Sequence, residues 1–175
     1  MAMKKEKFIT VMAVFDHETQ LLLEELQNDF EHRYGIDTKT KGIPFHITLG
    51  SYAVEQTEEI IARIKDVAGR TEPFAVHFKG LNHFGNVVRY LEPECSEKLL
   101  ELHQWFDSDY ANGFDKWEPH ATLYRHAEPT EIEMDAELAR KVAVWMRLKN
   151  LFFALCPQAQ PIRQRLQIIR LCCRR

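Results

Sequence analysis

Pro44-Phe45-His46-Ile47-Thr48-Leu49 and Glu118-Pro119-His120-Ala121-Thr122-Leu123 are the two stretches that decide how this chain folds, because both contain the pattern His-x-Thr-Leu. With this composition, roughly 0.04 occurrences of the pattern are expected by chance in the whole chain. Two are present, 74 residues apart. The duplication predicts two similar halves, each of which presents one histidine and one threonine.

The spacing within each pattern is that of a β-strand. Residues i and i+2 of a strand point to the same side, roughly 6.6 Å apart along it. The histidine and threonine of each copy are therefore expected on one side, while the residue between them and the leucine face a hydrophobic core. Two such strands facing each other would place His46, Thr48, His120 and Thr122 around one small anionic group.

These four side chains can carry out phosphodiester chemistry without a metal ion. Hydrolysis at phosphorus needs a base that takes a proton from water and an acid that protonates the leaving alkoxide. Imidazoles, with an ordinary pKa near 6.5, can serve as one of each near neutral pH. Threonine hydroxyls can donate hydrogen bonds to the non-bridging oxygens, where charge develops in the transition state.

The rest of the chain alternates between strand-like and helix-like segments. Strands are predicted over 8–15, where both faces should be buried, and over 45–52, 74–78, 87–91, 120–125 and 166–173. A first helix is predicted between a cap at Asp16 and a stop at Gly35, with Leu22, Leu26 and Phe30 on one face, and a second over 55–68, ended by Gly69. A third is predicted after Pro93, around Leu99, His103 and Phe106. A fourth should follow a capping box formed by Thr130 and Glu133. Residues 148–165 give no clear pattern. This order predicts one domain over 1–175, built from two similar α/β lobes around a central cleft.

Composition limits the class of partner. The formal net charge of −3 argues against non-specific binding to duplex nucleic acid, so an RNA substrate would have to be a short piece or an end. No apolar run is long enough to span a bilayer, and no signal peptide is evident. The four cysteines show no C-x-x-C spacing and are expected to be reduced, which favours a cytoplasmic protein.

The paired motif resembles the two-histidine (2H) phosphoesterase superfamily, and specifically its 2′-5′ RNA ligase-like and cyclic phosphodiesterase group. The similarity is best from Ile43 to Arg125, and the last ~25 residues match the family poorly. The resemblance implies an α+β fold with two pseudo-symmetric lobes, mostly antiparallel sheets and one motif in each lobe. It implies catalysis by His46 and His120, and phosphate binding by Thr48 and Thr122. The implied reactions are opening of 2′,3′-cyclic or related phosphates, or cleavage and ligation of 2′-5′ linkages, on nucleotides or RNA ends.

Four further residues are candidates for the substrate pocket. By two-residue alternation Tyr124 shares the side of His120 and could stack on a base, although a structural role is an equal interpretation; Tyr52 is a weaker case of the same kind. The resemblance suggests that Phe84 lines the cleft, although core packing is the favoured interpretation. Arg125 ends a His-x-Thr-Leu-x-Arg string, but the same alternation points it away from the histidine.

Other interpretations remain open. No metal ligand and no cofactor are predicted, because the remaining histidines lack the spacing of a His-Glu-x-x-His site. No ATP-binding motif supports an ATP-dependent ligase, so any ligation would reverse diester cleavage. The alternative hypothesis is a nucleotide- or RNA-binding module that keeps the fold without turnover. The substrate, the division of acid and base between the two histidines, and the oligomeric state are not determined by the sequence.

Overall fold

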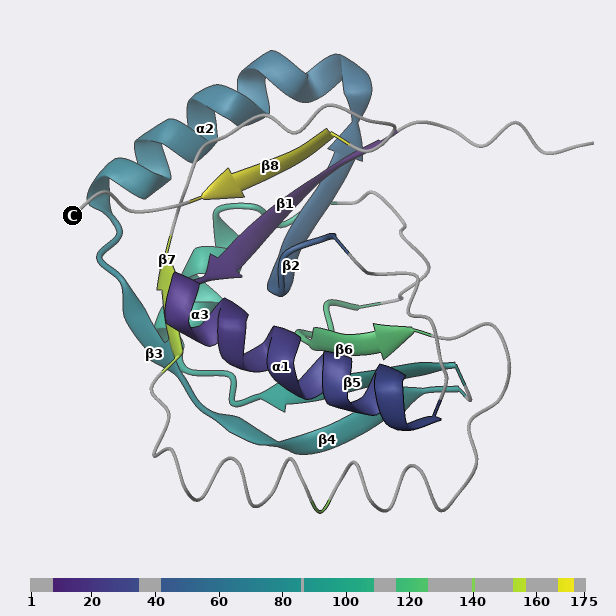
Figure 1. Cartoon of the computed structure of the whole chain (residues 1–175). Helices are drawn as coiled ribbons and strands as arrows, with labels where there is room; N and C mark the ends of the chain where they lie inside the picture. Colours follow the sequence, from purple (N-terminus) through teal and green to yellow (C-terminus); the bar gives the residue numbers. More distant parts are fainter. Residues whose placement is uncertain are drawn as a thin grey trace, which may run out of the picture.

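In the computed structural model, helices are combined with two β-sheets (Figure 1). The structure describes residues 8–34, 42–85, 87–108, 116–125, 140, 153–156 and 167–171. Within these ranges the strand pairing is mostly antiparallel, so the predicted α+β class is confirmed. One His-x-Thr-Leu motif belongs to each sheet. The division into two pseudo-symmetric lobes stays a prediction.

The larger sheet holds the first motif. Its strand order is β2 (His46–Ala53), β1 (Phe8–Phe15), β7 (Phe153–Cys156) and β3 (Phe74–Val76). β8 (Gln167–Leu171) also pairs with β1, in parallel. Every residue of β1 after Phe8 is buried, as the sequence predicted for a strand covered on both faces. β7 is a short strand within residues 148–165, where no element was predicted.

The smaller sheet holds the second motif, in the order β4 (Phe78–Phe84), β5 (Val88–Pro93) and β6 (Ala121–Arg125). The prediction of a single strand over 74–78 is wrong, because β3 pairs within the larger sheet whereas β4 begins the smaller one. Phe74, Val76 and Phe78 are all buried, so their alternation runs through the change of sheet without a break. A buried alternating pattern shows that a chain is extended, but it does not show which strand it pairs with.

The helices begin largely where the sequence placed them. In α1 (His17–Tyr34), the Asp16 carboxylate accepts a hydrogen bond from the backbone N–H of Thr19 at 2.7 Å, which confirms the predicted cap. Leu23 and Leu26 are its buried leucines. A 3-10 turn, η1 (Val54–Gln56), leads into α2 (Thr57–Arg70).

The predicted stop of α2 at Gly69 is wrong, since the helix continues to Arg70 and the backbone first becomes extended at Thr71. α3 (Glu97–Gln104) is capped by Ser96, and Pro93 is the last residue of β5 rather than part of the helix start. Gly35 and the predicted helix after Thr130 lie outside the described residues. No helix in the described part of the chain is long and apolar enough to cross a membrane.

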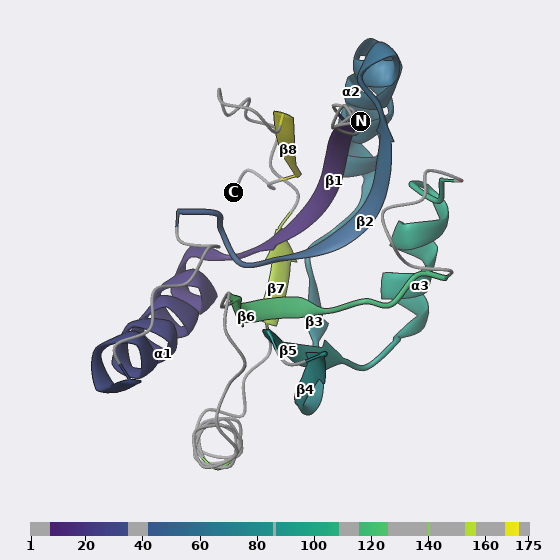
Figure 2. The same ribbon diagram turned by 90° about the vertical axis from the view of Figure 1, so that its right-hand side faces the viewer.

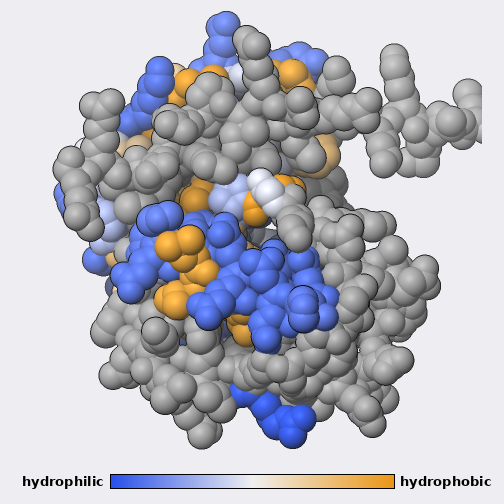
Figure 3. Space-filling model, viewed as in Figure 1, coloured by the Kyte–Doolittle hydropathy of each residue, from blue (hydrophilic) through white to orange (hydrophobic). Residues whose placement is uncertain are grey.

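α1 and α3 each link two strands of one sheet and also contact the other sheet. α1 lies between β1 and β2 in sequence, yet it crosses the smaller sheet and contacts β6 (Figures 1 and 2). α3 lies between β5 and β6 in sequence and contacts β2. The outer surface around α1 is largely hydrophilic (Figure 3), with Leu21 as an exposed exception.

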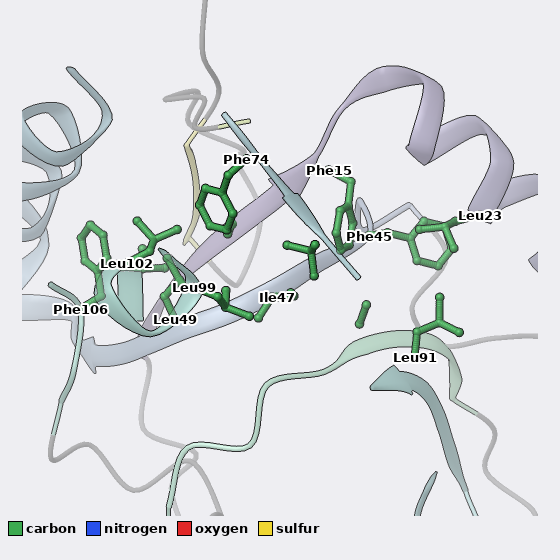
Figure 4. Packing of buried hydrophobic residues seen from close by; sticks show 14 of the residues in the cluster. Phe15, Leu23, Phe45, Ile47, Leu49, Phe74, Leu91, Leu99, Leu102 and Phe106 are labelled. Carbon is green, nitrogen blue, oxygen red and sulfur yellow. The ribbon is translucent and has the colours of Figure 1, made fainter. Parts of the chain in front are cut away.

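One hydrophobic core joins the two sheets and fixes the orientation of both motif strands. Ile47 and Leu49 of β2 are fully buried and point into this cluster, as Figure 4 shows beside Leu99 and Phe106. Ala121 and Leu123 of β6 belong to the same cluster. Burying two side chains such as Ile47 and Leu49 contributes about 3–6 kcal/mol. A one-residue slip of β2 would lose this contribution, so the histidine and threonine are held on the opposite side.

Candidate active site

The two motifs have the same burial pattern. The histidine and threonine of each are partly exposed, whereas the residue between them and the following leucine are buried. β2 and β6 also contact each other. The structure therefore brings His46, Thr48, His120 and Thr122 to facing strands, as the two-residue spacing predicted.

Each of the two imidazoles is held by a hydrogen bond of the same kind. Nδ1 of His46 lies 2.7 Å from the carbonyl oxygen of Pro44, and Nδ1 of His120 lies 2.7 Å from that of Glu118. A carbonyl oxygen can only accept, so Nδ1 carries the proton in both rings. In the neutral form Nε2 is then the unprotonated nitrogen of each ring, and it is the one that can accept a proton.

The electrostatic surroundings of the two histidines differ. The pKa of His46 is lowered to about 4, mainly by burial; the hydrogen bond to Pro44 acts to raise it, and the charge of His120 adds to the lowering. Burial also lowers the pKa of His120, but there the Glu118 carbonyl and the Glu118 carboxylate both act to raise it. Both rings are mainly neutral at pH 7 in the free protein, and His120 is the better placed to hold a proton.

Two aromatic rings of the smaller sheet support His120. The Phe84 ring meets the imidazole edge-on at 4.8 Å between centroids, and the Tyr90 ring lies 5.4 Å away, tilted by 60°. Phe84 and Tyr90 stack on each other at 4.3 Å. Phe84 thus lies beside the candidate catalytic histidine, as the resemblance suggested. The sequence analysis did not identify Tyr90, because its position depends on the pairing of β5 with Thr122 of β6.

A β-bulge lies at the leucine that ends each motif, and it changes the predicted orientation of the residues beyond it. Gly50 and Thr48 pair with consecutive residues of β1, so Leu49 is an extra residue. Tyr124 and Thr122 likewise pair with consecutive residues of β5, so Leu123 is extra. An extra residue shifts the alternation of side chains by one position.

The expectation that Tyr124 and Tyr52 share the side of the histidines therefore differs from the structure. Tyr124 is 2% exposed and Tyr52 is 4% exposed, and both lie in the core cluster. Burial raises the pKa of Tyr52 to about 12. Arg125, expected on the far side, is exposed, and the shifted alternation turns it to the side of His120 and Thr122. Arg125 thus replaces the two tyrosines as a candidate contact for an anionic substrate.

Several residues that hold the motif backbones were not identified from the sequence. The indole N–H of Trp117 donates to the carbonyl oxygen of Thr48 at 2.8 Å. The Gln20 side chain donates to the carbonyl oxygen of Phe45 at 2.7 Å and accepts from its N–H at 2.8 Å, directly before His46. These contacts join segments that are far apart in sequence, which a local pattern does not reveal. In the described ranges, no group of three or more His, Cys, Asp or Glu side chains is placed to hold a metal ion.

The chain is thus an α+β protein in which each of two sheets carries one histidine–threonine pair, on strands that contact each other. The chain belongs to the 2′-5′ RNA ligase superfamily, whose family model matches residues 15–144, and hence to the 2H phosphoesterase superfamily. The matched segment includes both motifs. No curated protein matches the chain. Membership supports a phosphoesterase or ligase activity in general, on small RNA or nucleotide substrates.

Proposed function

We propose that this protein is a metal-independent phosphodiesterase that acts on nucleotides or RNA ends. Its substrates are 2′,3′-cyclic or related cyclic phosphates, or 2′-5′ linkages, which it opens by acid–base catalysis between His46 and His120. The observation that carries this proposal is the matched pair of imidazoles on two strands that contact each other, each with Nδ1 hydrogen-bonded to the carbonyl oxygen two residues earlier.

The different surroundings of the two histidines support different roles, one as general base and the other as general acid. A general base has to be neutral, and the low pKa of His46 keeps that ring neutral throughout the physiological range. A general acid has to be protonated, and the Glu118 carboxylate favours a proton on His120. A bound phosphodiester anion would act against this lowering and raise the pKa of both rings. We assign His46 as the base that activates water and His120 as the acid that protonates the leaving alkoxide.

The remaining groups stabilise the phosphate. The hydroxyls of Thr48 and Thr122 donate to its non-bridging oxygens, where negative charge increases in the transition state. Arg125 supplies a positive charge on the same side of β6. Phe84 packs against His120 and restricts rotation of its ring. Ligation of a 2′-5′ linkage would use the same groups in reverse.

The test is to incubate the protein, in EDTA, with the four nucleoside 2′,3′-cyclic phosphates and with 2′-5′ dinucleotides, and to identify the products. Turnover should depend on pH as a bell-shaped curve whose limbs belong to the histidine pair. His46→Ala and His120→Ala should each reduce turnover by about 10²–10⁴-fold. The double variant should lose much less than the product of the two single losses.

His17→Ala is the matched control, because His17 is an exposed histidine at the start of α1. It should leave turnover unchanged. Unchanged turnover in a folded His46→Ala variant would contradict the mechanism. Nucleotide binding without any turnover by the wild-type protein would favour the binding-module hypothesis.

A further inference from the structure

The two motif strands share a feature beyond their histidines and threonines. In each, the motif leucine is the extra residue of a β-bulge. A bulge disrupts the ladder locally, so that the backbone there needs other hydrogen-bond partners. Both leucine carbonyls do accept a hydrogen bond from a side chain: His103 Nδ1 lies 2.8 Å from the carbonyl oxygen of Leu49, and Gln27 Nε2 donates to that of Leu123.

Both of these hydrogen bonds connect one sheet to the helix of the other, and we call them the cross-sheet bonds. His103 lies on α3, which links two strands of the smaller sheet, but it binds β2 of the larger sheet. Gln27 lies on α1, which links two strands of the larger sheet, but it binds β6 of the smaller sheet. The two connections are therefore reciprocal, and each one ends next to a motif threonine.

The surroundings of both donors restrict their movement. The His103 ring stacks on Trp117 with 3.8 Å between centroids and 7° between planes, and Trp117 binds the neighbouring carbonyl of Thr48. Gln27 is only 8% exposed. Two turns earlier on α1, Gln20 holds both backbone groups of Phe45, beside His46. One helix thus contacts the backbone at both motifs.

We propose that Gln27 and His103 are positioning residues, which set the spacing between the two motif strands and thereby between His46 and His120. The inference rests on the proposed function, because the spacing matters most when one phosphate has to reach both imidazoles. A displacement of about 1 Å in a catalytic group can reduce the rate by about 10²-fold. Loss of either cross-sheet bond should therefore lower kcat and have less effect on KM.

The experiment removes each donor while the shape of the side chain is kept. Gln27→Met and His103→Leu should reduce kcat by about 10–100-fold with KM changed less than about 3-fold, measured well below the melting temperature on a diester that the wild-type protein turns over. The double variant should lose less than the product of the single losses, because both bonds set one spacing. His103→Asn should recover most of the activity, since its Nδ2 can donate from the place of Nδ1.

Two exposed residues provide matched controls: Gln104→Met on α3 and His32→Leu on α1. Both should keep wild-type kcat. If Gln27→Met does not fold, Gln27→Glu replaces it, because glutamate keeps the shape and its carboxylate cannot donate. Wild-type kcat in folded Gln27 and His103 variants, or an equal loss in the controls, would overturn the proposal.

A binding measurement separates this proposal from the proposed function. Titration of the wild-type protein with inorganic phosphate should shift the imidazole NMR signals of His46 and His120 with a single affinity. The donor variants should bind phosphate about 10-fold more weakly, or shift one histidine alone. These results would support the positioning role even if no diester were turned over. Identical titrations in wild type and variants, or no shift of either histidine in the wild type, would overturn it.

Discussion

Acidification should destabilise this protein through His46, and the pKa of that residue determines how much. His46 has a pKa of about 4 in the folded chain and an ordinary value of 6.5 when unfolded. Between these values the unfolded chain binds a proton that the folded chain does not bind. The free energy of unfolding therefore falls as the pH decreases from about 6.5 to about 4, and the contribution of His46 is constant below that.

The size of the effect follows from the same two values. Between pH 7 and pH 5, the linkage relation gives a loss of about 2 kcal/mol for this shift. His46 keeps part of its surface exposed, and solvent screening reduces the effect, so we expect about 1–2 kcal/mol. For a chain of this size, that corresponds to a decrease of about 2–8 °C in the melting temperature.

The assay compares urea unfolding of the wild-type protein and His46→Asn at pH 7 and at pH 5. Asparagine does not titrate, and its side-chain N–H can still donate to the carbonyl of Pro44, so the variant should lose less stability on acidification. His17→Asn, a change at an exposed histidine, should lose as much as the wild type. An equal loss in His46→Asn and wild type would refute the reasoning, because the pKa of His46 would then not be lowered by burial.

Three further predictions address the phosphate site and the backbone around it. Thr48→Val and Thr122→Val should each reduce turnover by about 10–10³-fold with little change in melting temperature, and steady-state kinetics at wild-type rates would contradict the phosphate-binding role. Binding of inorganic phosphate at pH 7 should be accompanied by proton uptake, because the anion raises the pKa of both histidines; calorimetry in buffers of different ionisation enthalpy measures this, and identical heats would count against it. Gly50→Ala should lower the free energy of unfolding by about 1–3 kcal/mol or more, because a Cβ there would lie 1.9 Å from the carbonyl oxygen of Phe106. In Gly69→Ala, at a position in α2 where a Cβ has open space, the free energy of unfolding should rise by about 0.5–1 kcal/mol. Similar effects of the two changes in urea unfolding would exclude the close approach of Gly50 to Phe106.

The sequence predicted the parts of the site that depend on local geometry. The two-residue period correctly predicted that His46 and Thr48 share one side of their strand, as do His120 and Thr122, because both residues of each pair precede the bulge. The prediction failed for Tyr52, Tyr124 and Arg125, which lie beyond the bulges. The extra residue in each bulge is a leucine, whose hydrophobic character is the same in a regular strand, so nothing in the sequence signals it.

Contacts between distant segments were also beyond prediction. Gln27 and Leu123 are 96 residues apart, and their hydrogen bond exists only because α1 crosses the smaller sheet. In the sequence, Gln27 is a polar residue among the polar positions of an amphipathic helix, which is typical of a solvated face. The change of sheet at His77 could not be predicted either, because it depends on which strands are available for pairing and not on the residues themselves.

Both motif strands lie at the end of a sheet among the described strands, β2 in the larger sheet and β6 in the smaller. A strand in this position presents unpaired backbone groups, which can pair with a strand of another chain and lead to aggregation. Here the carbonyls of Thr48, Leu49 and Leu123 are already occupied by side chains of Trp117, His103 and Gln27. These side chains protect the strand edges without covering them with a further strand. The proposed phosphate-binding site can thus stay open to its substrate at a sheet edge while the same edge resists association with other chains.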